Sequence, residues 1–353
     1  MAVGMVFIPR VSSLRCAVCY AVLLTAMPHM IAYGIEIRMY SWACMFTSCT
    51  AIFALCYIKK LPHSMPFLIT CTVLGAYTHQ FALIAEALIW LMLLLVSVRD
   101  KRFKDWIKGA LICFVCYIPC AVLTVYQMKK ASGYFKASPA DIRNLLASLR
   151  FPFVTNLTPV SLLLLLCVLS LFILAVIKRD LTAAWYIILP AVITFMSYSL
   201  MFITGSTFFS ARYLLPAMGV LWLGAALAAD HIPDSRVFRI CFLIITLSSL
   251  VITYVQEFRT EYRKDQGFEE FAAVLNNGGA YTVYEDFPEI GICMEYYAPA
   301  AKECSIDELR RFPGKRYILV NENLTDPDPD LSGSEYVGNY SFDRYTFRTY
   351  ILR

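Results

Sequence analysis

Hydrophobic residues fall into long unbroken runs along most of this chain. Between residues 14 and 256 each run spans about 16 to 23 positions, and a short polar or basic stretch separates it from the next. A helix of about 20 apolar residues crosses the hydrocarbon core of a bilayer. The pattern therefore predicts about nine transmembrane helices. These are expected at 14–33, 36–58, 64–79, 80–98, 106–128, 157–177, 182–203, 212–229 and 237–256.

The hydrophobic pattern changes to that of a soluble domain near residue 260. Residues 262–277 carry apolar side chains at helical spacing, and Ser305 to Glu308 fits a capping box that opens a short helix. Short β-rich runs make up much of the rest. They are expected at 281–285, 316–320, 335–342 and 345–353. We predict a membrane domain at 1–259 and a small α/β domain at 260–353.

Composition agrees with a membrane protein. Of the 353 residues, 59% are hydrophobic and 16% are charged, against roughly 45 to 50% and 25% in a soluble domain. The formal net charge is +5, but the basic residues lie mostly in short connections between apolar runs, so we expect no nucleic-acid partner. Most of the thirteen cysteines lie inside apolar runs and behave as small hydrophobes. No spacing predicts a metal site.

The basic connections predict the orientation of the chain in the cell membrane. Lysine and arginine in short loops stay on the cytoplasmic side. If the N-terminus is cytoplasmic, nearly all short basic loops fall on that side, although loop 129–156 carries five basic residues on the other. The C-terminal domain is then extracytoplasmic. The cytoplasmic set is Arg10, Arg15, Lys59, Lys60, Arg99, Lys101, Arg102, Lys104, Lys178, Arg179, Arg236 and Arg239.

Two groups of polar residues lie near the predicted outer ends of these helices, where charge is costly and often functional. Glu36 and Arg38 join the first two helices and could face a polar cavity, or could compensate each other while capping the second helix. His79 and Gln80 form the next outer turn, with Glu86 about two helical turns deeper. Each could line a cavity, but His79 could equally be an interfacial residue and Glu86 a structural acid.

Arg212 and Tyr213 mark the outer start of the predicted helix at 212–229. A guanidinium offers a planar fork of donors that matches a phosphate. Aromatic residues flank Arg212 at the depth of the lipid headgroups. The alternative is an interfacial arginine whose charged end reaches the headgroups without binding a ligand.

Three segments resemble GT-C glycosyltransferases, and in particular the bacterial family-39 branch that is similar to protein O-mannosyltransferases and aminoarabinose transferase. They are Met27 to Tyr40 (MPHMIAYGIEIRMY), Gly75 to His79 (GAYTH) and Phe209 to Pro216 (FSARYLLP). The resemblance implies a polytopic enzyme that moves a sugar from a polyprenyl-phosphate carrier to a glycan, lipid or protein acceptor at the outer membrane face.

The resemblance also implies roles for individual residues. Arg212, Arg38 and Tyr213 would bind the donor and its phosphate. Basic side chains or a divalent cation would assist the departing phosphate. The residues lining the donor cavity would be Glu36, Tyr40, His79, Gln80 and Glu86.

The catalytic residue itself is not identified. In the family, an aspartate in the first outer loop activates the acceptor hydroxyl, and that loop precedes the segment matching Met27 to Tyr40. Only 26 residues precede Met27, so the expected aspartate would lie upstream of Met1 in a longer protein. The competing hypotheses are a noncatalytic remnant or binding subunit, a transporter of lipid carriers, and a polymerase or ligase of surface polysaccharides. A transporter predicts an inverted repeat, and a polymerase predicts a long outer loop.

Overall fold

The computed structural model of the chain consists of two compact units, Met1–Val255 and Gln256–Arg353. It describes residues 1–29, 33, 39–131, 141–153, 159–205, 208–232, scattered positions between 244 and 259, 272–273, 279–284, 300–322, 331–342 and 345–352.

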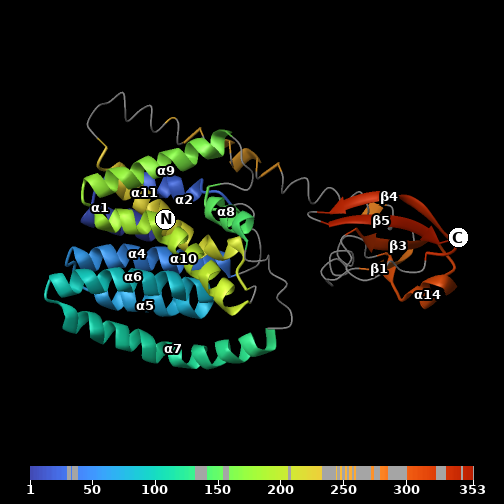
Figure 1. Cartoon of the computed structure of the whole chain (residues 1–353), viewed down its shortest axis with the longest axis horizontal. Coiled ribbons are helices and arrows are strands. Elements are labelled where there is room, and N and C mark those ends of the chain that lie inside the picture. The colour runs from blue at the N-terminus through green and yellow to red at the C-terminus, as the bar shows by residue number, and fades with distance from the viewer. Residues whose placement is uncertain are drawn as a thin grey trace. The chain divides into compact units, whose positions relative to one another are not determined.

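The first unit is a bundle of helices that run alongside one another (Figure 1). Five of the described helices are long and apolar enough to cross a membrane: Tyr40–Ile58, Gln80–Arg99, Phe103–Tyr126, Leu181–Thr204 and Ala211–Ala229. Shorter apolar helices accompany them, so the bundle is compatible with a multi-pass membrane protein. The elements are α1 (Ala2–Val11), α2 (Leu14–Thr25), α4 (Tyr40–Ile58), α5 (Ser64–Thr78), α6 (Gln80–Arg99), α7 (Phe103–Ala131), α8 (Ile142–Arg150), α9 (Pro159–Ile177), α10 (Leu181–Thr204), η1 (Ala211–Leu214) and α11 (Leu215–Ala229).

The described helices follow the predicted hydrophobic runs as far as residue 229, whereas most of the run at 237–256 lies outside the described residues. Two helices were not predicted. Helix α1 precedes the first run, and α8 lies inside loop 129–156. Helix α8 begins because the Asp141 side chain accepts a hydrogen bond from the Asn144 N–H at 2.7 Å. Nine residues of mixed polarity do not form a hydrophobic run, and the prediction therefore missed it.

Three helices of the bundle end in the same unusual way. Lys60, Lys101 and Arg179 follow α4, α6 and α9 with φ near +60°, in the left-handed region that usually takes glycine. In the first of these caps the Leu61 N–H reaches back to the Cys56 carbonyl at 2.9 Å, and the other two have the equivalent bond. A cation at this position faces the negative end of the helix dipole.

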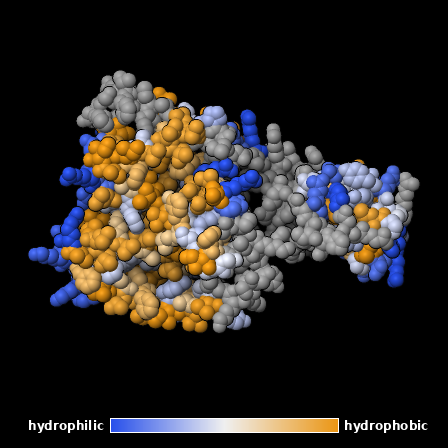
Figure 2. Space-filling model, in the orientation of Figure 1, coloured by the Kyte–Doolittle hydropathy of each residue, from blue (hydrophilic) through white to orange (hydrophobic). Residues whose placement is uncertain are grey.

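These three caps lie at one end of the bundle, which we call the basic end. Hydrogen bonds link the helix connections at this end. For example, the Arg102 side chain, between α6 and α7, donates to the Tyr57 carbonyl of α4 at 3.0 Å. His231 Nε2 lies 2.9 Å from an Asp180 carboxylate oxygen at the same end. Figure 2 shows hydrophilic side chains gathered at the end of the bundle where α6 turns into α7, and hydrophobic ones along the flank.

Helix α11 forms the centre of the bundle and packs closely on α10. Gly224 allows this contact, because a Cβ atom there would lie 2.8 Å from the Ala183 carbonyl oxygen and 2.8 Å from Tyr186 Cβ. The Tyr186 hydroxyl then donates to the Ala51 carbonyl of α4 at 2.9 Å. By contrast, α7 packs mainly on α5 and α6 among the described helices and exposes side chains such as Phe114. Such a face suits contact with lipid.

The second unit contains a five-stranded sheet in the order β2-β1-β3-β5-β4. Strands β2, β1 and β3 are parallel, whereas β3–β5 and β5–β4 are antiparallel. The predicted strands and the helix capped by Ser305 are confirmed; β2 was missed, and most of 262–277 lies outside the described residues. The elements are β1 (Ala280–Tyr284), β2 (Lys302–Glu303), α14 (Ile306–Arg311), β3 (Arg316–Asn321), β4 (Ser334–Phe342) and β5 (Tyr345–Leu352).

Candidate functional site

The three segments that carry the family resemblance meet at the end of the bundle opposite the basic end. Tyr40 begins α4, His79 forms the turn between α5 and α6, and Arg212 and Tyr213 lie in η1. The ring centroid of His79 is 5.4 Å from that of Tyr40 and 5.5 Å from that of Tyr213. We call this set, together with Tyr33, the aromatic–arginine cluster.

Aromatic rings enclose the cluster. The Tyr33 and Tyr40 centroids are 5.6 Å apart at a steep angle. On the other side, Phe81 stacks on Tyr213 at 5.0 Å, and Phe209 lies 5.4 Å from Phe81. These rings partly shield the cluster from water, which strengthens an electrostatic interaction made there.

Arg212 is the cation of the cluster. Its charge lies close to the phenol groups of Tyr33, Tyr40 and Tyr213, and its guanidinium carbon is 5.8 Å from the Tyr213 ring centroid. Its Nε is buried and has no hydrogen-bond partner among the described residues. A buried donor without a partner is costly, but protein atoms cover this nitrogen, so an anion would have to reach the charge of Arg212 through another nitrogen of its guanidinium.

His79 is held as a neutral hydrogen-bond donor. Its Nδ1 accepts the Phe81 N–H at 3.0 Å, which caps the start of α6. The proton of the neutral ring therefore sits on Nε2. Burial, aided by the charge of Arg212, lowers the pKa of His79 from 6.5 to about 4. At neutral pH the ring can donate to an oxygen atom but is a poor general base.

A second histidine borders the cluster, and sequence reasoning missed it. His29 is 2% exposed, and its Nε2 donates to the Phe151 carbonyl at 2.8 Å. Its ring stacks on the Phe151 ring at 4.0 Å and lies 6.1 Å from that of Tyr33. Burial lowers the pKa of His29 to about 4. The only sequence signal was its place within the Met27 to Tyr40 segment.

The remaining predicted site residues lie elsewhere. Gln80 is exposed at the start of α6. Glu86 is fully buried on α6, where its Oε1 accepts a hydrogen bond from the Thr50 hydroxyl at 3.3 Å and its carboxyl group lies against Gly75 of α5. This packing joins α4, α5 and α6 and favours a structural role. Glu36 and Arg38 lie outside the described residues.

The contact between Gly75 and Glu86 can be tested. A methyl group at Gly75 would overlap the Glu86 carboxyl group, so Gly75→Ala should lower the free energy of unfolding by about 1 to 3 kcal/mol. The measurement is the thermal unfolding midpoint in detergent. Glu86→Gln keeps the side-chain volume and should not relieve the loss, whereas Glu86→Ala should. If Gly75→Ala lowered the unfolding midpoint equally in the Glu86→Gln and Glu86→Ala proteins, the strain would not come from the contact with Glu86.

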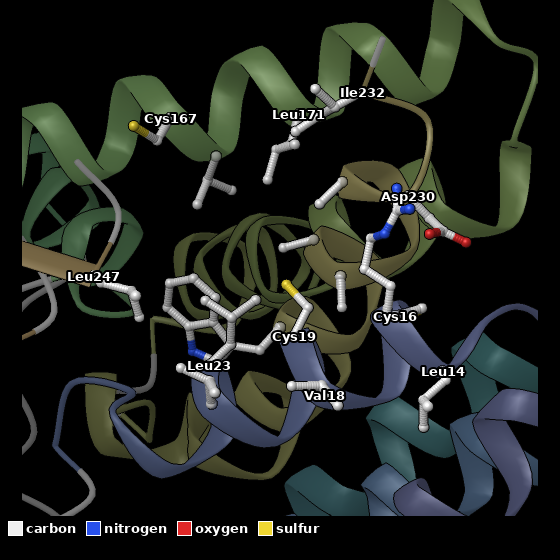
Figure 3. A pocket seen from close by; sticks show the side chains of 17 residues that line it. Leu14, Cys16, Val18, Cys19, Leu23, Cys167, Leu171, Asp230, Ile232 and Leu247 are labelled. Atoms are coloured by element: carbon white, nitrogen blue, oxygen red, sulfur yellow. The ribbon is translucent and has the colours of Figure 1, made fainter. Parts of the chain in front are cut away.

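A cavity elsewhere in the bundle differs in character from the aromatic–arginine cluster. It measures about 580 Å³ and lies between α2, α9 and α11. Figure 3 shows Cys19 and Leu23 of α2 facing Cys167 and Leu171 of α9 across it, with Asp230 at one end. Asp230 accepts hydrogen bonds from two neighbouring serine hydroxyls at 3.1 and 2.8 Å. The lining is mostly apolar and suits hydrocarbon, with Arg15 and Asp230 as its charged members.

Within the described part of the chain, no group of three or more histidine, cysteine, aspartate or glutamate residues could hold a metal ion. The described side chains of the aromatic–arginine cluster are a guanidinium, a neutral imidazole and phenol hydroxyls. Comparison with families of known proteins, with curated proteins and with solved structures found no match for this chain.

Proposed function

We propose that this chain is a membrane glycosyltransferase of the GT-C type, which moves a sugar from a polyprenyl-phosphate carrier to an acceptor at the outer membrane face. The aromatic–arginine cluster would bind the donor. The observation that supports this most directly is the contact between Tyr40, His79 and Tyr213, because it joins three distant segments that resemble the same family. The charge of Arg212, close to the phenol groups of three tyrosines, also supports an anion site at this end of the bundle.

The chemistry of the cluster matches a phosphate that leaves a sugar. Arg212 would hold the phosphate oxygens and stabilise the charge they gain as the bond to the sugar breaks. His79 would donate a further hydrogen bond from Nε2, and the tyrosine rings would cover the sugar. The acceptor oxygen attacks the anomeric carbon and loses its proton to a base. The described members of the cluster include no carboxylate, so that base is not among them.

The proposal includes an orientation. With about nine membrane crossings and a cytoplasmic N-terminus, the basic end faces the cytoplasm and the cluster faces outward. The domain at 260–353 would then be extracytoplasmic and could contact the acceptor. Lys60, Lys101 and Arg179, each at a helix end, support this orientation because cations in short loops stay inside.

The proposal is tested with Arg212→Ala in the full chain, reconstituted in vesicles that contain a radiolabelled polyprenyl-phosphate sugar. We expect the substitution to weaken donor binding about tenfold to a hundredfold, since a hydrogen bond to a charged group contributes about 1.5 to 3 kcal/mol. Arg212→Lys should restore only part of the donor binding, because an ammonium group cannot form a bidentate contact with the phosphate. Retention of labelled donor by the purified protein is the measurement.

The matched control is Arg143→Ala, which removes an exposed guanidinium from α8 near η1. Donor binding unchanged in Arg212→Ala, or equally weakened in Arg143→Ala, would contradict the assignment.

A second function is donor binding without transfer, as in a binding subunit. The described members of the cluster could bind an anion but supply no base for the acceptor hydroxyl, and Glu36, the nearest carboxylate in the sequence, lies outside the described residues. The same vesicles distinguish the two functions. Binding that depends on Arg212 with no release of labelled polyprenyl phosphate, when acceptors are supplied, would identify a binding subunit.

A further inference from the structure

A second cavity, with charged residues in its lining, is at the basic end, opposite the aromatic–arginine cluster. It measures about 450 Å³ and is formed by the α4–α5 connection, the α6–α7 connection and the first turns of α5 and α7. The charged residues that line it are Lys60, Arg102, Asp105 and Lys108, so three cations face one carboxylate. The cavity therefore carries an excess of positive charge.

The backbone adds to this positive potential. Helix α5 begins at Ser64, next to the cavity, and no side chain caps its first N–H groups. Uncapped N–H groups at a helix N-terminus attract anions. His63, which precedes the helix, has φ of 58°, so strained backbone presents this turn at the cavity wall.

Contacts with Tyr57 hold the Arg102 side chain in place, and two of its nitrogens have no hydrogen-bond partner among the described residues. Its guanidinium carbon lies 4.2 Å from the Tyr57 ring centroid, and Nη1 donates to the Tyr57 carbonyl. Nη2 is 3.8 Å from an Asp100 carboxylate oxygen, too far for a hydrogen bond. Both Nε and Nη2 are buried without a hydrogen-bond partner among the described residues. Protein atoms cover these two nitrogens, so Arg102 acts on the cavity through its positive charge.

The lower wall of the same cavity is apolar. Met65 and Ile69 of α5 and Ile112 of α7 line it below the cations, and α7 exposes its apolar flank along the span. A ligand that fits this cavity has an anionic head and a hydrocarbon chain directly beneath it. Anionic phospholipids of the leaflet at the basic end have this shape, and basic pockets between membrane helices bind such headgroups.

We propose that this cavity is a binding site for the phosphate headgroup of an anionic phospholipid. The site rests on the membrane placement of the bundle and is independent of sugar transfer. Lys108 contacts the phosphodiester, Arg102 adds positive charge from the cavity wall, Lys60 lies at the rim, and the acyl chain lies along Met65, Ile69 and Ile112. The lipid thereby joins α7, which has few other contacts among the described helices, to the rest of the bundle.

The test uses the full chain in neutral detergent, titrated with phosphatidylglycerol or phosphatidylcholine and followed by native mass spectrometry. The pocket variant is Lys60→Asn with Lys108→Gln. Asparagine is chosen because it tolerates the left-handed backbone of Lys60. We expect this double variant to weaken phosphatidylglycerol binding about thirtyfold, because each lysine near an anionic headgroup contributes about 1 kcal/mol. Phosphatidylcholine binding should not change.

The matched control is Lys59→Gln with Lys104→Gln, which removes the same charge from exposed positions of the same two connections outside the cavity. Its affinity for phosphatidylglycerol should stay within about twofold of that of the parent protein. Equal losses in both double variants, or no loss in either, would overturn the proposal. Saturation of the site by millimolar inorganic phosphate would also overturn it, since the ligand would then be a free anion. Lys108→Gln alone, on the surface of α7, serves if the double variant does not fold.

Discussion

Replacing Gly224 with valine should prevent the helical bundle from assembling. A Cβ at this position would lie 2.8 Å from the Ala183 carbonyl oxygen and 2.9 Å from the Ile187 nitrogen, which are backbone atoms of α10. No side-chain rotation relieves such a contact, so α10 would have to move away from α11 as a whole. That movement would also break the hydrogen bond from Tyr186 to Ala51. The loss should exceed about 3 kcal/mol, the upper end for ordinary overpacking.

The measurement is the monodisperse fraction of detergent-solubilised protein on size exclusion, together with its thermal unfolding midpoint. Gly224→Ala should give an intermediate loss, because it adds one methyl group at the same place. Cys116→Val is the control, since the Cys116 side chain is exposed on α7. A Gly224→Val protein that eluted and unfolded like the parent would refute the close contact between α10 and α11.

The helices themselves could be predicted because a bilayer imposes a length and a composition on whatever crosses it. The runs at 36–58 and 80–98, for example, became α4 and α6 with ends within a few residues of expectation. The strands of the second unit could be predicted from β-rich runs between turn residues. Strand β2 was too short to produce such a run, and α8 was too polar to produce a hydrophobic one.

The candidate site could be predicted only in part. Tyr40, His79, Arg212 and Tyr213 were each expected near the outer helix ends, and the structure brings them into one cluster. Their ring contacts, however, depend on how each helix is rotated, which hydropathy does not encode. Glu86 lies outside the cluster for a simple geometric reason. It follows His79 by seven residues, which places it about 10 Å further along α6. It packs against Gly75 instead of joining the cluster.

The state of His79 also depends on tertiary structure. Its position at an outer turn suggested either a cavity residue or an interfacial one. The bond from the Phe81 N–H determines which ring nitrogen carries the proton, and the proximity of Arg212 opposes a second proton. Neither could be inferred before the turn at residue 79 and η1 were brought together. His29 was missed for the same reason, because its partner Phe151 lies 122 positions away in the chain.

The two ends of the bundle thus offer different anion chemistry. The aromatic–arginine cluster has one enclosed guanidinium among rings, whereas the cavity at the basic end has three cations around an open mouth. The first arrangement suits a specific ligand whose phosphate is buried, and the second suits a headgroup that stays partly in water.

Lowering the pH from 7.5 to 4.5 should destabilise the bundle strongly. The pKa values of His29 and His79 fall from 6.5 to about 4 on folding, chiefly because of burial. Between pH 6.5 and about 4 the unfolded chain binds protons at these histidines and the folded chain does not. The free energy of unfolding therefore falls as the pH falls. Above pH 6.5 neither group contributes. A pKa change of this size corresponds to at most about 3 kcal/mol for each imidazole. The measurement is the unfolding midpoint in detergent across this range.

The contribution of His29 can be isolated by substitution. His29→Gln keeps a donor for the Phe151 carbonyl but cannot titrate, so this protein should lose less stability on acidification than the parent. His63→Asn is the control, because the His63 side chain is exposed and asparagine tolerates its left-handed backbone. Carboxyl groups that titrate in the same range are common to all three proteins and cancel in the comparison. If His29→Gln were as acid-sensitive as the parent, the buried imidazole of His29 would not be a source of the effect.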